Sequence, residues 1–355
     1  MEGGGIEVGR WNTWSAGVSA GMPLVNAQLW KSLRISDQDV ELAVEKARSS
    51  RLETVNQVKK AFYACLLAKD AFYVYKSAYE NALANLEQIQ KKYNAQKASE
   101  LELTRAKTTL ANAIPSVYDA ENAMYVCLWQ LKAVMGVDLD ANLDTGGELE
   151  DYVGVMQGMF ENIDMSLDRN SSMKQLAIQA EQLANAVKLQ QYANVPSLSL
   201  SFAYNLNAMT NDFNFSQYKW SPYSFVGVSM AIPIFAGGKR ASAIKQARIQ
   251  AEELSIQREN TERQLKIAIR QYLNAMENSV KSLDAAQSAV ETAQKAYGIA
   301  TKSYDVGRST LTDLNDAQYA LTQAQLTVSN AIYSFVTSQA DLENILGADF
   351  TENDK

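Results

Sequence analysis

Apolar residues recur with the spacing of a coiled-coil seam in two stretches of the chain that lie 211 positions apart. The interval alternates between three and four residues in both stretches, which is the rhythm of a helix packed along one narrow face. Nine of the ten positions stay apolar when 211 is added to each residue number: Leu103, Ala106, Leu110, Ala113, Val117, Ala120, Met124, Cys127, Leu131 and Val134 become Leu314, Ala317, Leu321, Ala324, Val328, Ala331, Phe335, Ser338, Leu342 and Ile345. Stacked repeats have periods of about 20–50 residues, so this longer period indicates the duplication of a whole structural module.

Two earlier stretches carry the same seam and predict two very long helices. Apolar positions run from Phe72 to Tyr93 and, in the same phase, from Leu265 to Tyr304. Each helix should span about 65 residues, or about 100 Å at a rise of ~1.5 Å per residue. Each ends at a matching break, 93–99 or 304–310, after which a second seam returns. We therefore expect each copy to be an extended antiparallel helical hairpin.

The spacing of apolar residues changes from a period of 3.5 to a period of two around Pro23, Pro196, Pro222 and Pro233. The segments 13–24, 197–207 and 223–234 place apolar residues on one face and small or polar residues on the other, which is the weak signature of outer-membrane β-barrel strands. Aromatic residues that could form an interfacial girdle gather near one end: Trp11, Trp14, Tyr204, Tyr218, Trp220 and Tyr223. The stretch 206–222 is polar and aromatic and is predicted to be an external loop. The alternative is a soluble sheet, but three strands alone would leave both of its edges exposed.

Composition narrows the chemistry. The 33 basic and 40 acidic residues give a net charge of −7, which argues against a nucleic-acid partner. The chain has no histidine, and we find neither a nucleophile–base pair nor a phosphate-binding glycine loop, so we expect no catalysis, no metal and no cofactor. Cys65 and Cys127 fall within helical apolar patterns and are predicted to be small buried hydrophobes. A disulfide between them would require their helices to pair antiparallel.

Several motifs at the joints between elements resemble those of a known family. Pro233 and the pair Gly237-Gly238 stand between a strand and a long helix, Val195-Pro196 opens a strand, and Tyr304-Asp-Val-Gly307 is followed by Thr312-Asp-Leu-Asn-Asp-Ala317. Together with the Leu-Gly end of each copy, this combination resembles the TolC-like outer-membrane efflux proteins over nearly the whole chain.

The resemblance implies a mainly α fold with a small β part, built from duplicated α-helical hairpins and outer-membrane β-barrel strands in a homotrimer. It also implies a passive channel of a tripartite efflux or type I secretion system. The channel would sit in outer-membrane lipid, extend into the periplasm and dock to a periplasmic adaptor and an inner-membrane pump, which would supply the energy. The expected division is 1–24 (strand of the first copy), 25–135 (first hairpin), 136–171 (equatorial segment), 172–194 (helix of the second copy), 195–235 (strand hairpin), 236–347 (second hairpin) and 348–355 (tail).

The first copy lacks counterparts of helix 172–194 and strand 197–207. By internal symmetry we expect the chain to begin in an external loop, to lack a signal peptide and roughly the first 80–100 residues, and to contribute three strands rather than four.

The acids after the second break form the candidate gate. Asp313 and Asp316 lie three apart on one helix face, and Glu102 occupies the position of Asp313 in the first copy. The resemblance implies that these aspartates line a periplasmic entrance, and that Tyr304, Glu102 and a nearby arginine hold it closed. Arg308 lies one position before the family's arginine. The alternative is an ordinary solvated acidic helix face.

The turns themselves are the candidate docking sites for an adaptor, at Tyr93, Gln96, Gly307 and Ser309. A competing interpretation of the whole chain is a coiled-coil scaffold or stalk without transport activity, and a carboxylate enzyme is a more distant one. A channel would need detergent for extraction, whereas a scaffold would dissolve in buffer. The sequence does not indicate which substrate, pump or adaptor is involved.

Overall fold

The computed structural model describes residues 9–156 and 165–347, so the predicted tail at 348–355 lies outside the described residues. The chain forms two compact units, one from Met1–Val44 and Gln175–Arg258 and the other from Glu45–Lys174 and Glu259–Lys355. Three of the helices contribute residues to both units. Within the described ranges, no helix is both long and apolar enough to cross a membrane.

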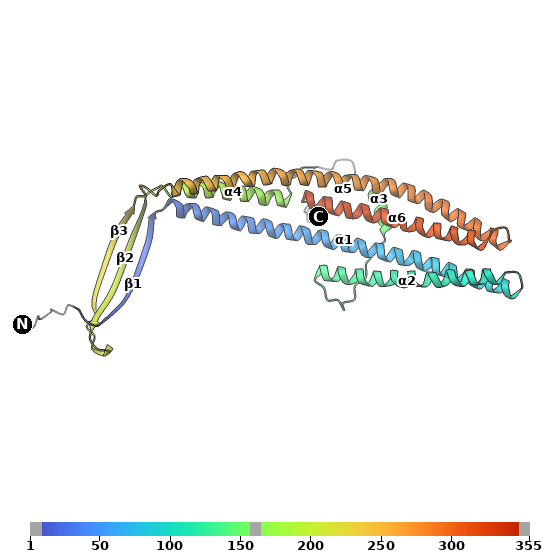
Figure 1. Ribbon diagram of the computed structural model, residues 1–355, viewed down its shortest axis with the longest axis horizontal. Coiled ribbons are helices and arrows are strands. Elements are labelled where there is room, and N and C mark those ends of the chain that lie inside the picture. The colour runs from blue at the N-terminus through green and yellow to red at the C-terminus, as the bar shows by residue number, and fades with distance from the viewer. Residues whose placement is uncertain (1–8, 157–164, 348–355) are drawn as a thin grey trace, which may run out of the picture. The chain divides into compact units, whose positions relative to one another are not determined.

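The fold is mostly helical with one small sheet, as the sequence predicted (Figure 1). The elements in chain order are β1 (Asn12–Val25), α1 (Ala27–Asn94), α2 (Glu100–Met135), η1 (Leu149–Tyr152), α3 (Val153–Met156), α4 (Ser171–Tyr192), β2 (Ser197–Thr210), η2 (Phe215–Gln217), β3 (Ser221–Ala231), α5 (Lys239–Asp305) and α6 (Leu311–Leu346).

The three strands form an antiparallel sheet in the order β1-β2-β3. Leu200 lies between Met22 of β1 and Val228 of β3, and the next residue, Ser201, lies between two glycines. In this part of the sheet, apolar residues therefore share one face and small residues share the other, as the period-two pattern predicted, whereas Phe225 and Tyr223 lie further along the second face. On the small face, the hydroxyls of Ser199 and Ser229 are 2.8 Å apart.

The strand limits differ most from the predicted ones at the ends of β2 and β3. β2 continues to Thr210, so the predicted loop begins later than Leu206, because residues 206–210 still pair with β1. β3 ends at Ala231 rather than Ile234. Pro233 has no backbone N–H to continue the ladder, and Gly237 and Gly238 then adopt positive φ angles of 56° and 80°.

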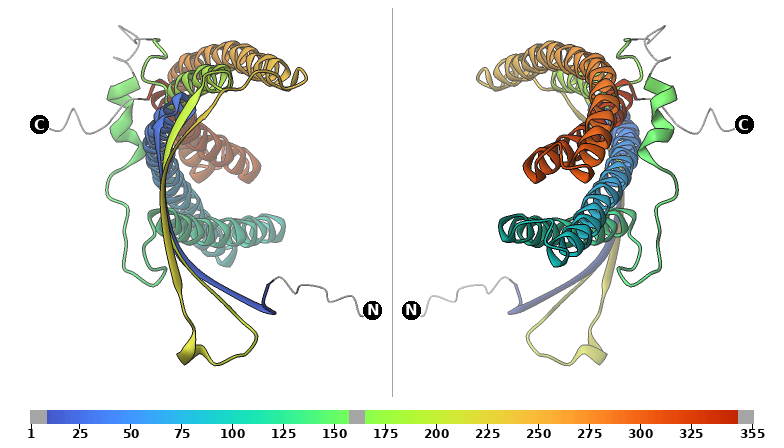
Figure 2. Two further views of the ribbon diagram at one scale, coloured as in Figure 1. Left: turned by 90° about the vertical axis from the view of Figure 1, so that its left-hand side faces the viewer. Right: turned by 90° about the vertical axis from the view of Figure 1, so that its right-hand side faces the viewer.

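The helical hairpins have equal returning arms. α1 ends at Asn94 and α2 begins at Glu100, while α5 ends at Asp305 and α6 begins at Leu311, so both limits differ by the 211 positions of the duplication. α2 and α6 each contain 36 residues and end at a left-handed glycine, Gly136 and Gly347. Figure 2 (right) shows the two reversals, with the α5–α6 loop in orange-red and the α1–α2 loop in blue-green. The predicted reversals after Tyr93 and Tyr304 are confirmed.

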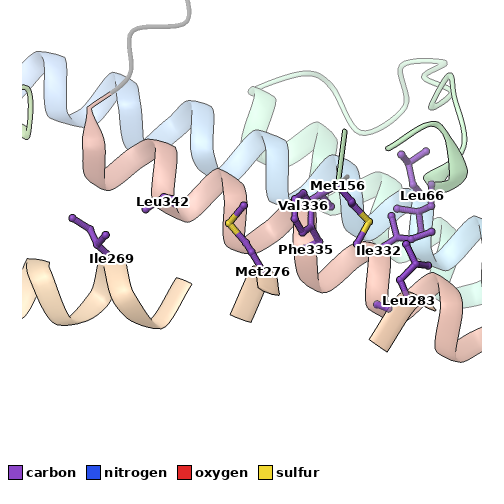
Figure 3. Close-up of a cluster of buried hydrophobic side chains, with 11 residues drawn as sticks. Leu66, Met156, Ile269, Met276, Leu283, Ile332, Phe335, Val336 and Leu342 are labelled. Carbon is purple, nitrogen blue, oxygen red and sulfur yellow. The ribbon is translucent and has the colours of Figure 1, made fainter. Parts of the chain in front are cut away.

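α6 contributes to the larger of the two apolar clusters found among the described residues of the second unit. Phe335, Ile332 and Val336 of α6 are almost completely buried. Figure 3 shows them packed with Leu66 of α1 and Leu283 of α5. Burial of such side chains stabilises the folded state by about 1.5–3 kcal/mol each.

The segment between the two copies is fixed to the ends of helices. The Nζ of Lys132 donates to the carbonyl of Leu139 at 2.7 Å, just after α2. Arg48 of α1 donates to the carbonyls of Arg169 and Gly347, at 3.1 and 3.0 Å, and so satisfies an acceptor at the end of α6. Leu149 and Met156, from η1 and α3, are fully buried in the core around Phe335.

Candidate functional site

Both hairpins reverse through the same backbone turn. In the first, the N–H of Gln96 donates to the carbonyl of Tyr93 at 2.9 Å, and the N–H of Lys97 donates to that of Lys92 at 2.7 Å. The equivalent bonds of the second run from Gly307 to Tyr304 and from Arg308 to Ser303, at 3.1 and 2.8 Å. This paired pattern is a Schellman motif, which requires a left-handed residue at its fifth position. Gln96 and Gly307 supply it, with φ angles of 61° and 74°.

The returning helices begin with matching capping boxes. Ser99 and Thr310 are the N-cap residues, and their hydroxyls accept from the N–H of Glu102 and of Asp313, each at 3.2 Å. The carboxylates reach back to the N-cap N–H at 2.7 and 2.8 Å. Bonds from the backbone and hydroxyl of Thr310 lower the pKa of Asp313. Two of the predicted gate acids therefore have a local structural role.

Tyr304 is buried at the meeting of the two hairpins, with 7% of its surface exposed. Its ring lies 4.5 Å from the ammonium of Lys92, which belongs to the other hairpin. Burial raises the pKa of Tyr304, and the nearby charges of Glu102 and Asp305 raise it further. Tyr304 therefore carries a neutral phenol under a cation at the reversal.

Polar contacts join the first hairpin to the second along this surface. Lys92 forms an ion pair with Asp305 at 3.4 Å, and Gln88 donates to the same carboxylate. On the returning helices, Arg105 donates to the hydroxyl of Thr312 at 3.3 Å, and Asn315 donates to the hydroxyl of Thr109 at 3.1 Å. We call the residues that make these bonds the inter-hairpin contacts: Gln88, Lys92, Arg105, Thr109, Asp305, Thr312 and Asn315.

The structure separates the predicted gate residues into two groups. Tyr304 and Glu102 lie close enough to interact electrostatically. Asp313 and Asp316 project from the exposed face of the first turns of α6, and Arg308 is exposed in the turn. The described contacts of Tyr304 run to Lys92 rather than to Arg308. Among the predicted docking residues, Gln96 and Gly307 are exposed, and Ser309 donates to the carbonyl of Ala300 at 3.3 Å.

Comparison with known proteins decides the family. The outer membrane efflux protein family model matches residues 2–137 and 162–348. The chain belongs to the outer membrane efflux protein family. It is 24% identical over 337 residues to the outer membrane protein TolC of Vibrio cholerae serotype O1, a match that covers 94% of this chain and 76% of the relative.

Two solved structures of outer membrane proteins share the fold. The outer membrane protein VceC of Vibrio cholerae superposes with a TM-score of 0.76 at 16% identity, over 96% of this chain and 88% of that one. The CmeC outer membrane channel of Campylobacter jejuni superposes with a TM-score of 0.74 at 18% identity, over 95% and 78%. At these identities, the superpositions establish the fold.

Sequence reasoning missed the inter-hairpin contacts and the capping boxes of this efflux family member. The boxes carry a readable signal, because Ser99-x-x-Glu102 and Thr310-x-x-Asp313 each precede an apolar helix. The inter-hairpin contacts have no such signal in the sequence, because the equivalent positions of the other copy hold residues of a different kind. Adding 211 takes Lys92 to Ser303 and Arg105 to Asp316. Comparison of the two copies therefore could not reveal these residues, because each is present in only one copy.

Removing either capping hydroxyl should destabilise the reversal. We expect Ser99→Ala and Thr310→Ala each to cost about 1 kcal/mol, because the start of the helix loses an acceptor for its free N–H groups. The pKa of Asp313 is lower in the folded state, so its share of the cap is present at neutral pH and is lost as acid protonates it. Hydrogen exchange of the amides of Glu102 and Asp313 measures the effect; equal protection in wild type and variants would contradict it.

Proposed function

We propose that this chain is a subunit of a passive trimeric channel in the outer membrane. Three copies would share one β-barrel and one α-helical cylinder that extends into the periplasm. The channel would belong to a tripartite efflux or type I secretion system, with a periplasmic adaptor and an inner-membrane pump as partners. It would perform no catalysis, because the pump supplies the energy.

One observation carries this proposal: a family member joins a sheet with one exposed apolar face to helices of 68 and 67 residues. Val226, Val228 and Met230 are each more than 60% exposed on that face, at 71%, 65% and 62%. Exposed apolar side chains on every other residue are what lipid requires of a barrel strand. The backbone groups at the edges of β1 and β3 would be satisfied by the strands of neighbouring subunits.

We place the gate at Asp313 and Asp316. Both carboxylates are exposed near the start of α6, where a trimer would stack them as two rings of three charges. Rings of like charge attract cations and raise their local concentration, so the entrance should select cations and be blocked by multivalent ones. The inter-hairpin contacts would hold the entrance closed, and the turns at Gln96 and Gly307 would receive the adaptor.

Single-channel recording tests the gate. Asn keeps the oxygen that caps α6 but removes the charge, so Asp313→Asn/Asp316→Asn should abolish block by a trivalent cation while leaving the helix start intact. Glu291→Gln is the matched control, because this carboxylate lies on an exposed face of α5, paired with Lys295 at 2.6 Å. Unchanged block by the trivalent cation in the double variant would contradict the gate and favour the alternative, in which Asp313 and Asp316 are part of an ordinary solvated helix face.

Extraction behaviour tests the wider proposal. The exported protein should require detergent and should sediment as a trimer, because each subunit leaves an apolar sheet face and two sheet edges uncovered. Full recovery in buffer as a monomer or an elongated dimer would favour the scaffold interpretation instead.

A further inference from the structure

The only two cysteines of the chain lie at the same level of the first hairpin. Residues of an antiparallel pair that face each other have numbers with a constant sum. Ile89 and Leu103 pack in one cluster and sum to 192, and Leu86 and Ala106 pack there with the same sum. Cys65 of α1 and Cys127 of α2 also sum to 192. The register of the hairpin therefore brings the two thiols together.

The local environment agrees with this register. Cys65 is 1% exposed and Cys127 is partly buried, and the two free thiols lie close enough to influence each other's pKa. Burial and, to a smaller extent, the neighbouring Cys127 raise the pKa of Cys65 to about 12. Burial also raises the pKa of Cys127, while the neighbouring Cys65 lowers it.

Helix geometry accommodates a bond between them. Packed helices have axes about 8–10 Å apart, and their Cα atoms lie about 2.3 Å from each axis. Facing Cα atoms of two helices with axes about 10 Å apart are therefore separated by about 5 Å, within the range of about 4.4–6.8 Å that a disulfide spans.

We propose that Cys65 and Cys127 form a disulfide that joins α1 to α2 when the protein is exported. This inference rests on the proposed function in one respect, because disulfides persist in an oxidising compartment such as the periplasm. The oxidant is a disulfide-bearing thiol oxidase. The thiolate of one cysteine attacks the oxidant's disulfide and releases one thiolate, and the thiolate of the other cysteine then attacks the first cysteine's sulfur in the mixed disulfide and releases the second thiolate. Two electrons and two protons pass to the oxidant, which leaves as a dithiol.

The bond should form while the hairpin is still folding, when both thiols are solvated. Once buried, thiols with raised pKa values react slowly, and the disulfide is shielded from reductants for the same reason. The second hairpin has no counterpart, because Met276 and Ser338 occupy the equivalent positions. The disulfide therefore fixes only the first hairpin and leaves the one that carries Asp313 without a cross-link.

Sequential alkylation tests the proposal on the exported chain. The protein is quenched in acid, extracted from membranes, denatured, treated with iodoacetamide, then reduced and treated with N-ethylmaleimide. We expect iodoacetamide to add to neither cysteine and N-ethylmaleimide to add to both. Cys127→Ser is the control, because its single thiol should react with iodoacetamide without reduction. Wild-type protein that has been denatured, reduced and refolded with reductant should melt about 5–10 °C below the oxidised form, whereas Cys65→Ser/Cys127→Ser should melt at the same temperature after either treatment.

Quantitative reaction of both cysteines with iodoacetamide would overturn the proposal. Refolding the reduced, denatured protein in the presence of diamide then identifies the reason, because the thiols are accessible until the hairpin closes. A cross-link formed by diamide would mean that the hairpin does bring the two sulfurs together, but that the protein does not reach an oxidising compartment. That result would contradict the proposed function. No cross-link would mean that the hairpin does not bring the two sulfurs within bonding distance.

Discussion

Replacing Phe335 with alanine is expected to lower the free energy of unfolding by about 3–5 kcal/mol. The ring is fully buried in a core built from α1, α3, α5 and α6, so its removal leaves a cavity that these packed helices can only partly close. Urea unfolding of the detergent-solubilised protein, followed by helical circular dichroism, measures the loss. A shift of the midpoint without a change in slope would show that stability alone has changed.

The duplication supplies a matched control for Phe335. Met124 occupies the same seam position in the first copy but is only partly buried. Met124→Ala should therefore cost clearly less than Phe335→Ala. Equal losses at the two positions would mean that burial in the isolated chain does not decide stability, and that contacts between subunits cover Met124 to the same extent.

The sequence predicted the helices well because their seams repeat a single physical requirement. An apolar position every three or four residues has to face a neighbouring helix, and both copies keep it from Leu103 to Leu131 and from Leu314 to Leu342, except at Ser338. The reversals were predictable for the same reason, since both copies lose the seam at equivalent places. Strand limits were less accurate, because β2 extends through residues such as Asn207 and Thr210 that pair only in the presence of β1.

The candidate site was predictable only where the two copies agree. Glu102 and Asp313 correspond and do occupy the same place in the two capping boxes. Lys92, by contrast, acts on Tyr304 and Asp305 from a different hairpin, and no local pattern relates positions so far apart in the sequence. Tyr93 and Tyr304 are equivalent in sequence, yet 38% of the first is exposed and 7% of the second. Packing between the hairpins decides that difference.

Placing arginine at position 228 should destabilise the channel in a lipid bilayer by about 2–4 kcal/mol. Val228 is 65% exposed on the apolar face, and a charged side chain near the bilayer midplane loses its hydration. Ser229→Arg is the matched control, because its neighbour in the sheet is Ser199, on the opposite face. That side chain would enter the aqueous lumen of the proposed barrel. Folding equilibria in lipid vesicles with increasing guanidinium chloride measure both variants.

The two substitutions separate the face that meets lipid from the face that meets water. Loss of stability at Val228 with tolerance at Ser229 would support the proposed orientation of the sheet. The reverse result would mean that Val226, Val228 and Met230 point inward, and it would contradict the proposed channel, because a lumen lined by those side chains would be apolar. Equal tolerance would contradict it as well, since a sheet without a lipid-facing side has no hydrocarbon to exclude a charge.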